Sequence, residues 1–273
     1  MNLKRILLLF LFVHSLAVYT NGQLKPRTLV VRSGPFELRA QLFQPNGPGP
    51  FPAVLFSPGS GQSPSINNVG RLFARHGYVL LALYRRGQGL SADQGPESGA
   101  LVTRERATNG DVAANRLQMS LLEGEQLQET LDALVVLRSV QGVDTNRIAL
   151  VGHSFGGSLS MLVAERDPSI RAIVNFAGAA GSWNRSALLR ERLIAATRKL
   201  QSPMLYIQAA NDYSTVPGEV LSAELQRLGK THRLKTYPAF GKTAAAGHSI
   251  LYLSIETWQQ DVFDFLDEFV GRR

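Results

Sequence analysis

The residues best suited to chemistry are a serine framed by glycines at 152–156, which read Gly-His-Ser-Phe-Gly. A strand-like apolar run at 148–151 precedes them, and a helix-like apolar run at 159–164 follows. In such a tight strand-to-helix turn the serine hydroxyl is pushed into the open, and larger residues at the glycine positions would collide with the neighbouring strand and helix. The pattern predicts that Ser154 is a nucleophile; the alternative is a glycine-rich turn that only opens a core helix.

A serine hydroxyl needs a base, and the candidate is His248. In a strand–turn–helix site of this kind the acid and then the base follow the nucleophile along the chain. Of the five histidines, two lie well before the nucleophile, His153 adjoins it and is expected to point away, and His232 opens a predicted strand. His248 lies in a predicted loop of small residues, 246–249, between the last strand and the C-terminal helix. The alternative is an exposed loop histidine.

The carboxylate that would orient His248 is Asp212, in the polar stretch 211–217 just after a predicted strand. A carboxylate in this role fixes the imidazole tautomer and stabilises the imidazolium. Asp261 and Asp264 compete less well, because they lie on the C-terminal helix beyond His248. The alternative for Asp212 is a plain turn, since Asn-Asp pairs favour turns.

Two backbone N–H groups must face the charge that develops on a carbonyl oxygen. One is expected from Phe155, directly after the nucleophile. The other is expected from Ser60, in the loop 57–61, Ser-Pro-Gly-Ser-Gly, after the predicted strand 53–56. An ordinary Gly/Pro turn is the alternative for this loop.

A second glycine-containing loop, 84–91, ends the next predicted strand. Arg85 or Arg86 is expected either to brace this loop, which is the favoured interpretation, or to meet a substrate carboxylate. The loop matches neither the dinucleotide nor the P-loop pattern. No His/Asp/Glu group has metal-site spacing. The sequence therefore predicts no cofactor and no metal.

The elements that must position these residues form a strand–helix alternation. Two β-rich runs separated by Ser-Gly-Pro at 33–35 predict an antiparallel hairpin. The rest predicts an α/β fold, a mostly parallel sheet with helices on both faces. The expected strands are 28–31, 36–43, 53–56, 78–84, 147–151, 172–176, 204–207 and 232–237, and the apolar helix faces lie near 69–73, 127–135, 159–164, 220–228 and 258–269.

The segment 91–120 is polar and interrupts this rhythm, so it is expected to be a lid or another irregular excursion, with a disordered surface segment as the alternative. Substrate specificity is expected from this segment and from 183–200, where Trp183, Arg185 and Arg190 could line a pocket. For the arginines, a solvated helix is favoured.

The N-terminus has the layout of a cleaved secretory signal at 1–22, with Lys4 and Arg5 before the apolar run 6–13. Cleavage is expected after Gly22, with Ala17 as a second candidate and an uncleaved anchor as the alternative. A single domain, 23–273, would remain, without stable membrane insertion. The predicted location is secreted or periplasmic.

The amino-acid composition excludes several further classes of protein and of functional site. The 273 residues are 44% hydrophobic, enough for a packed core, and include no cysteine, which excludes disulfides, thiolate catalysis and cysteine metal sites. The formal charge of +8 falls to +6 without Lys4 and Arg5. The basic residues are scattered, so no nucleic-acid partner is expected.

Five motifs follow one another along the chain: the loop 57–61, Arg-Gly-Gln-Gly-Leu-Ser at 86–91, the serine turn 152–157, the segment 211–217 and Gly-His-Ser at 247–249. These motifs and their order resemble those of the α/β hydrolases, in particular the dienelactone-hydrolase-like and prolyl-oligopeptidase-like esterase branch. The resemblance runs from about residue 51 onward. It implies an eight-stranded α/β-hydrolase fold and the triad Ser154, Asp212 and His248, with oxyanion donors at Ser60 and Phe155.

Two departures limit what the resemblance implies. True dienelactone hydrolases use a cysteine nucleophile, and this chain has none. The usual His-Gly of the oxyanion loop is Pro58-Gly59 here. The expected activity is hydrolysis of small-molecule carboxylic esters through an acyl-enzyme. The alternatives are an exopeptidase or amidase with the same triad, and a catalytically silent binding protein.

Overall fold

The sheet begins with the expected hairpin. The computed structural model describes residues 25–62 and 64–271, so the predicted signal at 1–22 lies outside the described residues. Strands β1 (Arg27–Ser33) and β2 (Phe36–Phe43) pair antiparallel with Ser33 opposite Phe36. β2 then pairs antiparallel with β4 (Val79–Tyr84). The hairpin therefore forms one side of the sheet, and β1 is its edge strand.

The remaining strands are parallel and complete an eight-stranded sheet in the order β1-β2-β4-β3-β5-β6-β7-β8. All six residues of β4 are buried, as expected for a strand covered on both faces. The predicted α/β-hydrolase architecture is confirmed. The other strands are β3 (Phe51–Ser57), β5 (Val143–His153), β6 (Ala172–Phe176), β7 (Met204–Ala209) and β8 (His232–Tyr237).

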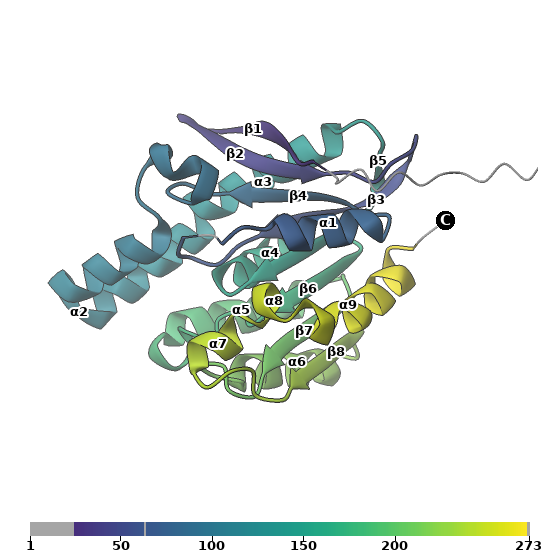
Figure 1. Ribbon diagram of the computed structural model, residues 1–273. Helices are drawn as coiled ribbons and strands as arrows, with labels where there is room; N and C mark the ends of the chain where they lie inside the picture. The colour runs from purple at the N-terminus through teal and green to yellow at the C-terminus, as the bar shows by residue number, and fades with distance from the viewer. Residues whose placement is uncertain (1–24, 63, 272–273) are drawn as a thin grey trace, which may run out of the picture.

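Helices cover both faces of the sheet (Figure 1). Alternate strand residues divide the core, so that Leu81 of β4 belongs to one apolar cluster and Leu80 to the other. The first cluster is closed by α3 (Glu125–Ser139), α4 (Phe155–Arg166), α5 (Ala187–Lys199) and α6 (Val216–Arg227). The second is closed by α1 (Asn67–Arg75), α8 (Ile250–Leu253) and α9 (Ile255–Phe269).

The segment 91–120 is helical rather than irregular. A short 3-10 helix, η1 (Gly89–Gln94), leads into α2 (Ser98–Glu123), which extends away from the body of the fold (Figure 1). Residues 107–112 of α2 are exposed, and Leu121 and Leu122 near its end are buried. The apolar periodicity is therefore confined to the last turns, which is why the sequence pattern missed the helix. The disordered alternative is wrong, and the role as a lid stays a prediction.

Two shorter elements complete the fold. The 3-10 helix η2 (Trp183–Arg185) precedes α5, and the helix α7 (Ala244–His248) follows β8. Within the described ranges, no helix combines the length and the apolar character needed to cross a bilayer.

Candidate active site

Ser154 lies at the turn between β5, which ends at His153, and α4, which begins at Phe155. Its backbone has φ 55° and ψ −118°, a region that costs a non-glycine residue about 1–3 kcal/mol. The Ser154 N–H donates to the carbonyl of Phe176 on the neighbouring β6 at 2.8 Å. The turn is thus strained and tied to the sheet, as a nucleophile elbow requires.

The glycines of this turn are required by close backbone contacts. A Cβ at Gly152 would lie 2.2 Å from the carbonyl oxygen of Gly156. A Cβ at Gly156 would lie 2.0 Å from the carbonyl oxygen of Ser57, at the end of β3. The expected collision with the neighbouring strand and helix is therefore present at both positions.

The structure brings Asp212 and His248 together. Nδ1 of His248 lies 2.8 Å from Oδ1 of Asp212, whose side chain is fully buried. The same Oδ1 accepts the backbone N–H of Tyr213 at 2.6 Å. Because a carboxylate oxygen only accepts, Nδ1 of His248 carries a proton. In a neutral imidazole, Nε2 is then unprotonated and can accept one.

His248 lies at the end of the short helix α7, not in an open loop as the sequence analysis expected. Thr243 caps this helix, because its side chain accepts the N–H of Ala246 at 3.1 Å. The run of small residues at 244–247 permits one helical turn, and its length gave too little periodicity to predict it.

Asn211 positions the same segment and was missed by the sequence analysis. Its Nδ2 donates to the carbonyls of Phe240 and Thr243, and its Oδ1 accepts the N–H of Phe240. A Cβ at Gly247 would lie 2.4 Å from that Oδ1. Asn211 and Asp212 therefore fix both the chain leading into α7 and the imidazole at its end. The only available signal was the Asn-Asp pair itself.

A cavity of about 240 Å³ lies at these residues. Ser154, His248 and Ser60 line it together. None of the hydrogen bonds within the described residues joins Ser154 to His248, although both border the same space. The other lining residues are Gly59, Gly61, Gln62, Pro64, His153, Ser249 and Tyr252.

Of the two expected oxyanion donors, Phe155 begins a helix and Ser60 lies in the loop after β3, beside the start of α2. Phe155 is the first residue of α4, where unpaired N–H groups favour negative charge. The carbonyl of Ser60 accepts the N–H of Gly99 in the first turn of α2 at 2.9 Å. Within the described residues, no hydrogen bond uses the N–H of Ser60 or of Phe155. Both donors are therefore free to bind a ligand oxygen.

The sequence analysis expected His153 to point away from the site, and this prediction is wrong. It is 6% exposed, lines the cavity, and its Nε2 lies 2.8 Å from the backbone carbonyl oxygen of His248. Burial, with a smaller effect from His248, lowers the pKa of His153 to about 3. The neutral ring therefore donates its Nε2–H to the backbone carbonyl of His248. This contact depends on how α7, which ends at His248, packs against the sheet.

The arginines of the 84–91 loop take the bracing role. Arg85 is fully buried and donates to the carbonyls of Pro58 and Gly59. Arg86 forms ion pairs with Glu125 and Glu129. Because Arg85 has no exposed surface, the alternative contact with a substrate carboxylate does not fit its position.

A smaller cavity of about 140 Å³ lies beside the two oxyanion candidates. Ser60, Phe155 and Arg185 line it together with residues of α2 such as Val102 and Arg106. Trp183 is buried, and its carbonyl accepts from Nη1 of Arg190 at 2.6 Å. Of the residues expected from 183–200 to line a pocket, Arg185 does so here.

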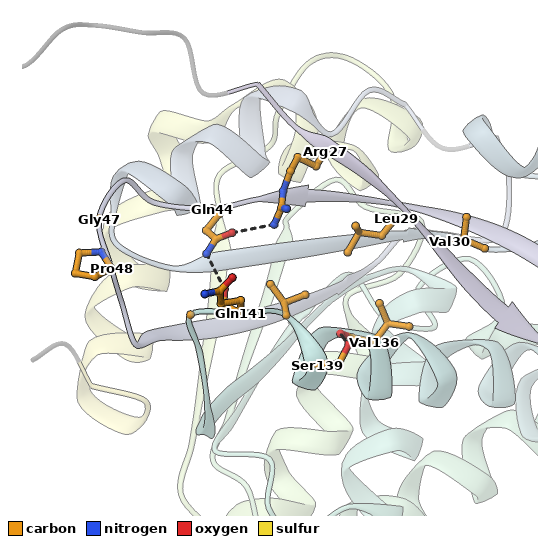
Figure 2. Close-up of a pocket in the computed structure, with 11 residues that line it drawn as sticks. Arg27, Leu29, Val30, Gln44, Gly47, Pro48, Val136, Ser139 and Gln141 are labelled. Atoms are coloured by element: carbon orange, nitrogen blue, oxygen red, sulfur yellow. Dashed lines mark hydrogen bonds between the residues drawn. The ribbon is translucent and has the colours of Figure 1, made fainter.

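A larger cavity, about 660 Å³, is shown in Figure 2. Its lining includes Gly142, directly before β5 begins, so it lies at the other end of that strand from Ser154. Gln44 crosses the cavity, accepting from Arg27 at 3.1 Å and donating to the carbonyl of Gln141 at 2.9 Å. Its lining has no serine–histidine–carboxylate arrangement. Across residues 25–62 and 64–271, no cluster of three or more His, Asp or Glu side chains could hold a metal ion.

The comparisons with known proteins agree with this fold. The sequence profile described as Dienelactone hydrolase family matches residues 38–269. The chain is 28% identical over 145 residues to platelet-activating factor acetylhydrolase of Cavia porcellus, covering 44% of this chain and 33% of that protein. It is 27% identical over 226 residues to Cutinase 2 of Thermobifida cellulosilytica, covering 77% and 76% of the two chains.

Among solved structures, acylaminoacyl peptidase of Pyrococcus horikoshii superposes with a TM-score of 0.67 at 16% identity. The match covers 91% of this chain and 42% of the peptidase. The chain thus spans a third of the length of the acetylhydrolase and less than half of the peptidase. At this identity the peptidase supports the fold alone.

Proposed function

This chain belongs to the dienelactone hydrolase family, and we propose that it hydrolyses small-molecule carboxylic esters through a catalytic triad of Ser154, His248 and Asp212. The observation that carries the proposal is the 2.8 Å contact between Nδ1 of His248 and the buried carboxylate of Asp212, at a cavity that Ser154 also lines. This contact leaves Nε2 of His248 as the base.

The reaction has two halves. Ser154 Oγ attacks the ester carbonyl carbon while Nε2 of His248 takes its proton, and the carbonyl oxygen becomes an oxyanion held by the N–H groups of Ser60 and Phe155. The intermediate collapses, the C–O bond to the alcohol breaks, and His248 gives its proton to the leaving oxygen. Water then attacks the acyl-enzyme, again with His248 as base, and releases the acid and free Ser154.

Ester hydrolysis is favoured over peptide hydrolysis by the names of the relatives that align with most of this chain. An exopeptidase or amidase would use the same triad, and the resemblance to a peptidase concerns the fold. Turnover of p-nitrophenyl acetate compared with an aminoacyl anilide separates the two activities. Hydrolysis of the anilide alone would contradict the esterase proposal.

Covalent labelling tests the nucleophile directly. A fluorophosphonate should form an Oγ–P bond at Ser154 with loss of fluoride, and Ser154→Ala should abolish both labelling and ester turnover. Ser158→Ala is the matched control, because Ser158 is buried one turn further along α4 and is expected to label normally. Equal labelling of Ser154→Ala would refute the proposal, and a folded wild type that never labels would support the silent binding protein.

We also propose that the chain is exported, with residues 1–22 removed as a signal peptide. The basic start and the apolar run 6–13 support this proposal. Intact mass measurement of the protein recovered from the periplasm or medium of an expressing bacterium should give a chain beginning at residue 23. A full-length chain retained in the membrane would instead support the uncleaved anchor.

A further inference from the structure

We propose that Arg85 is a positioning residue for the oxyanion hole: its buried guanidinium orients the Ser60 N–H and places a positive charge behind the hole. The inference rests on the proposed function, since it concerns the transition state that Ser154 would form. It adds a residue that contacts neither the substrate nor the triad.

The orientation follows from peptide geometry. Nη2 of Arg85 donates to the carbonyl oxygen of Gly59 at 2.6 Å, and Nε2 of Gln88 donates to the same oxygen at 2.7 Å. That carbonyl belongs to the peptide unit that ends in the Ser60 N–H. In a trans peptide, C=O and N–H point in opposite directions. Because the Gly59 oxygen is held towards Arg85, the Ser60 N–H points away from Arg85. Ser60 is also one of the residues that line the cavity.

The same guanidinium holds the loop at further points. Nη2 also donates to the carbonyl of Pro58 at 3.0 Å, and Nε donates to Oε1 of Gln126 on α3 at 2.8 Å. Its central carbon lies 5.5 Å from the ring centroid of Phe155, within reach of a cation–π contact. Arg85 thus contacts both segments that carry the proposed oxyanion donors.

The charge of Arg85 is the feature that a purely structural brace does not require. All its hydrogen bonds within the described residues go to neutral oxygens, and the buried carboxylate of Glu129 attracts its charge without making an ion-pair contact. Burial lowers its pKa to about 10, which leaves the group cationic at neutral pH. A buried charge without an ion pair is costly, and a neighbouring neutral side chain, Gln88, already bonds the Gly59 and Gly61 carbonyls.

A cation at this position benefits the reaction in two ways. A charge-assisted bond to the Gly59 carbonyl polarises that peptide, so the Ser60 N–H becomes a stronger donor. The positive charge also favours the oxyanion over the neutral ester carbonyl, because its field acts through a buried medium. Both effects apply to the transition state more than to the bound ester.

Arg86 provides a matched comparison on the next residue. Its side chain forms ion pairs with Glu125 and Glu129 and lies over the ring of Phe36 at 4.4 Å. Within the described residues, none of the hydrogen bonds, ion pairs or ring contacts of Arg86 reaches the 57–61 loop, so its role is separate from the oxyanion donors.

The experiment compares Arg85→Met, Arg85→Lys, Gln88→Met and Arg86→Lys in steady-state hydrolysis of p-nitrophenyl acetate, with circular dichroism and thermal melting to verify folding. Arg85→Met should lower kcat roughly 10- to 100-fold with KM nearly unchanged. Arg85→Lys should lose less, because it keeps the charge but not the forked geometry. Gln88→Met should lose less than Arg85→Met, and Arg86→Lys should keep the wild-type kcat.

A second measurement separates transition-state stabilisation from general loosening. A trifluoromethyl ketone forms an oxyanion-bearing adduct with the serine, so its affinity should fall by the same factor as kcat/KM in the Arg85 variants. A folded Arg85→Met protein with wild-type kcat, or one changed only in KM, would overturn the inference. If Arg85→Met does not fold, Arg85→Lys must still show the parallel loss or the inference fails. Persistent activity in Ser154→Ala would instead refute the proposed function.

Discussion

His153 Nε2 lies 2.8 Å from the backbone carbonyl oxygen of His248, so the residue before the proposed nucleophile is bonded to the residue that carries the proposed base. Their rings are 4.8 Å apart. Because the bond reaches the backbone of His248, it fixes the position of the imidazole relative to the elbow without using either ring nitrogen of the base.

Loss of this bond should weaken the reaction without removing any reacting group. His153→Phe keeps an aromatic ring of similar size but lacks the N–H, and we expect kcat to fall about 10-fold because the base shifts relative to Ser154. The control is His76→Phe, since His76 stacks on Phe263 away from the cavity. Steady-state kinetics on p-nitrophenyl acetate measure both variants, and equal kcat values would contradict a role for the bond.

The same histidine should make the stability depend on pH. Burial lowers the pKa of His153 to about 3 from its ordinary 6.5, so the unfolded chain takes up this proton first as the pH falls. The contribution of neutral His153 to the free energy of unfolding is on the order of 5 kcal/mol. It is fully present above about pH 6.5 and is lost as the pH falls towards 3. Urea unfolding at several pH values measures the slope, which His153→Phe should flatten; an unchanged slope would show that another group is responsible.

The order of the site residues could be predicted from the sequence, because each motif follows a strand. Parallel strands bring their carboxyl ends to one edge of a sheet, so Ser154 after β5 and Asp212 after β7 had to lie at the same edge. The glycine pattern at 152–156 also carried its own steric reason, which the backbone contacts show directly.

The contacts made by returning segments could not be predicted. His153 and Asn211 act on the chain around α7, and their partners depend on where residues 240–248 pack. The helix α2 was missed for a different reason, because its middle is exposed and has no apolar stripe. Long-range packing and solvent-exposed helices leave little periodic signal in a single sequence.

The carboxylate of Asp212 should matter through the tautomer of His248. Asp212→Asn keeps the side-chain shape, but its amide can donate a hydrogen bond to Nδ1 of His248. The imidazole proton then lies on Nε2, so Nε2 can no longer accept the proton of Ser154. We expect kcat to fall about 10⁴-fold with the fold unchanged. Asp264→Asn is the control, because Asp264 is exposed and bonds Gln260 on α9. A loss smaller than tenfold would argue that another acid orients His248.

The elbow glycine Gly156 should tolerate no side chain. Its Cβ would lie 2.0 Å from the Ser57 carbonyl oxygen and 2.4 Å from that of Pro58, so Gly156→Ala must displace the backbone beside the oxyanion loop. We expect a loss of about 3 kcal/mol in the free energy of unfolding, together with loss of activity. At Gly181 a Cβ would lie 3.9 Å from the Tyr213 ring, so Gly181→Ala should melt like the wild type. Thermal melting of a stable Gly156→Ala would show that the β3 end can move.

Tyr213 should contact the substrate at the mouth of the site. Its ring centroid lies 5.1 Å from that of His248, yet the side chain is 53% exposed, and an exposed aromatic beside a reacting group offers a stacking surface. We expect Tyr213→Ala to raise KM for esters with aromatic alcohols several-fold with little change for ethyl esters, and Tyr213→Phe to retain the low KM. Val30→Ala removes an apolar side chain of similar exposure, 48%, on the edge strand β1 and should change neither. An equal rise in KM for both ester classes would instead indicate that the Asp212–Tyr213 turn had moved.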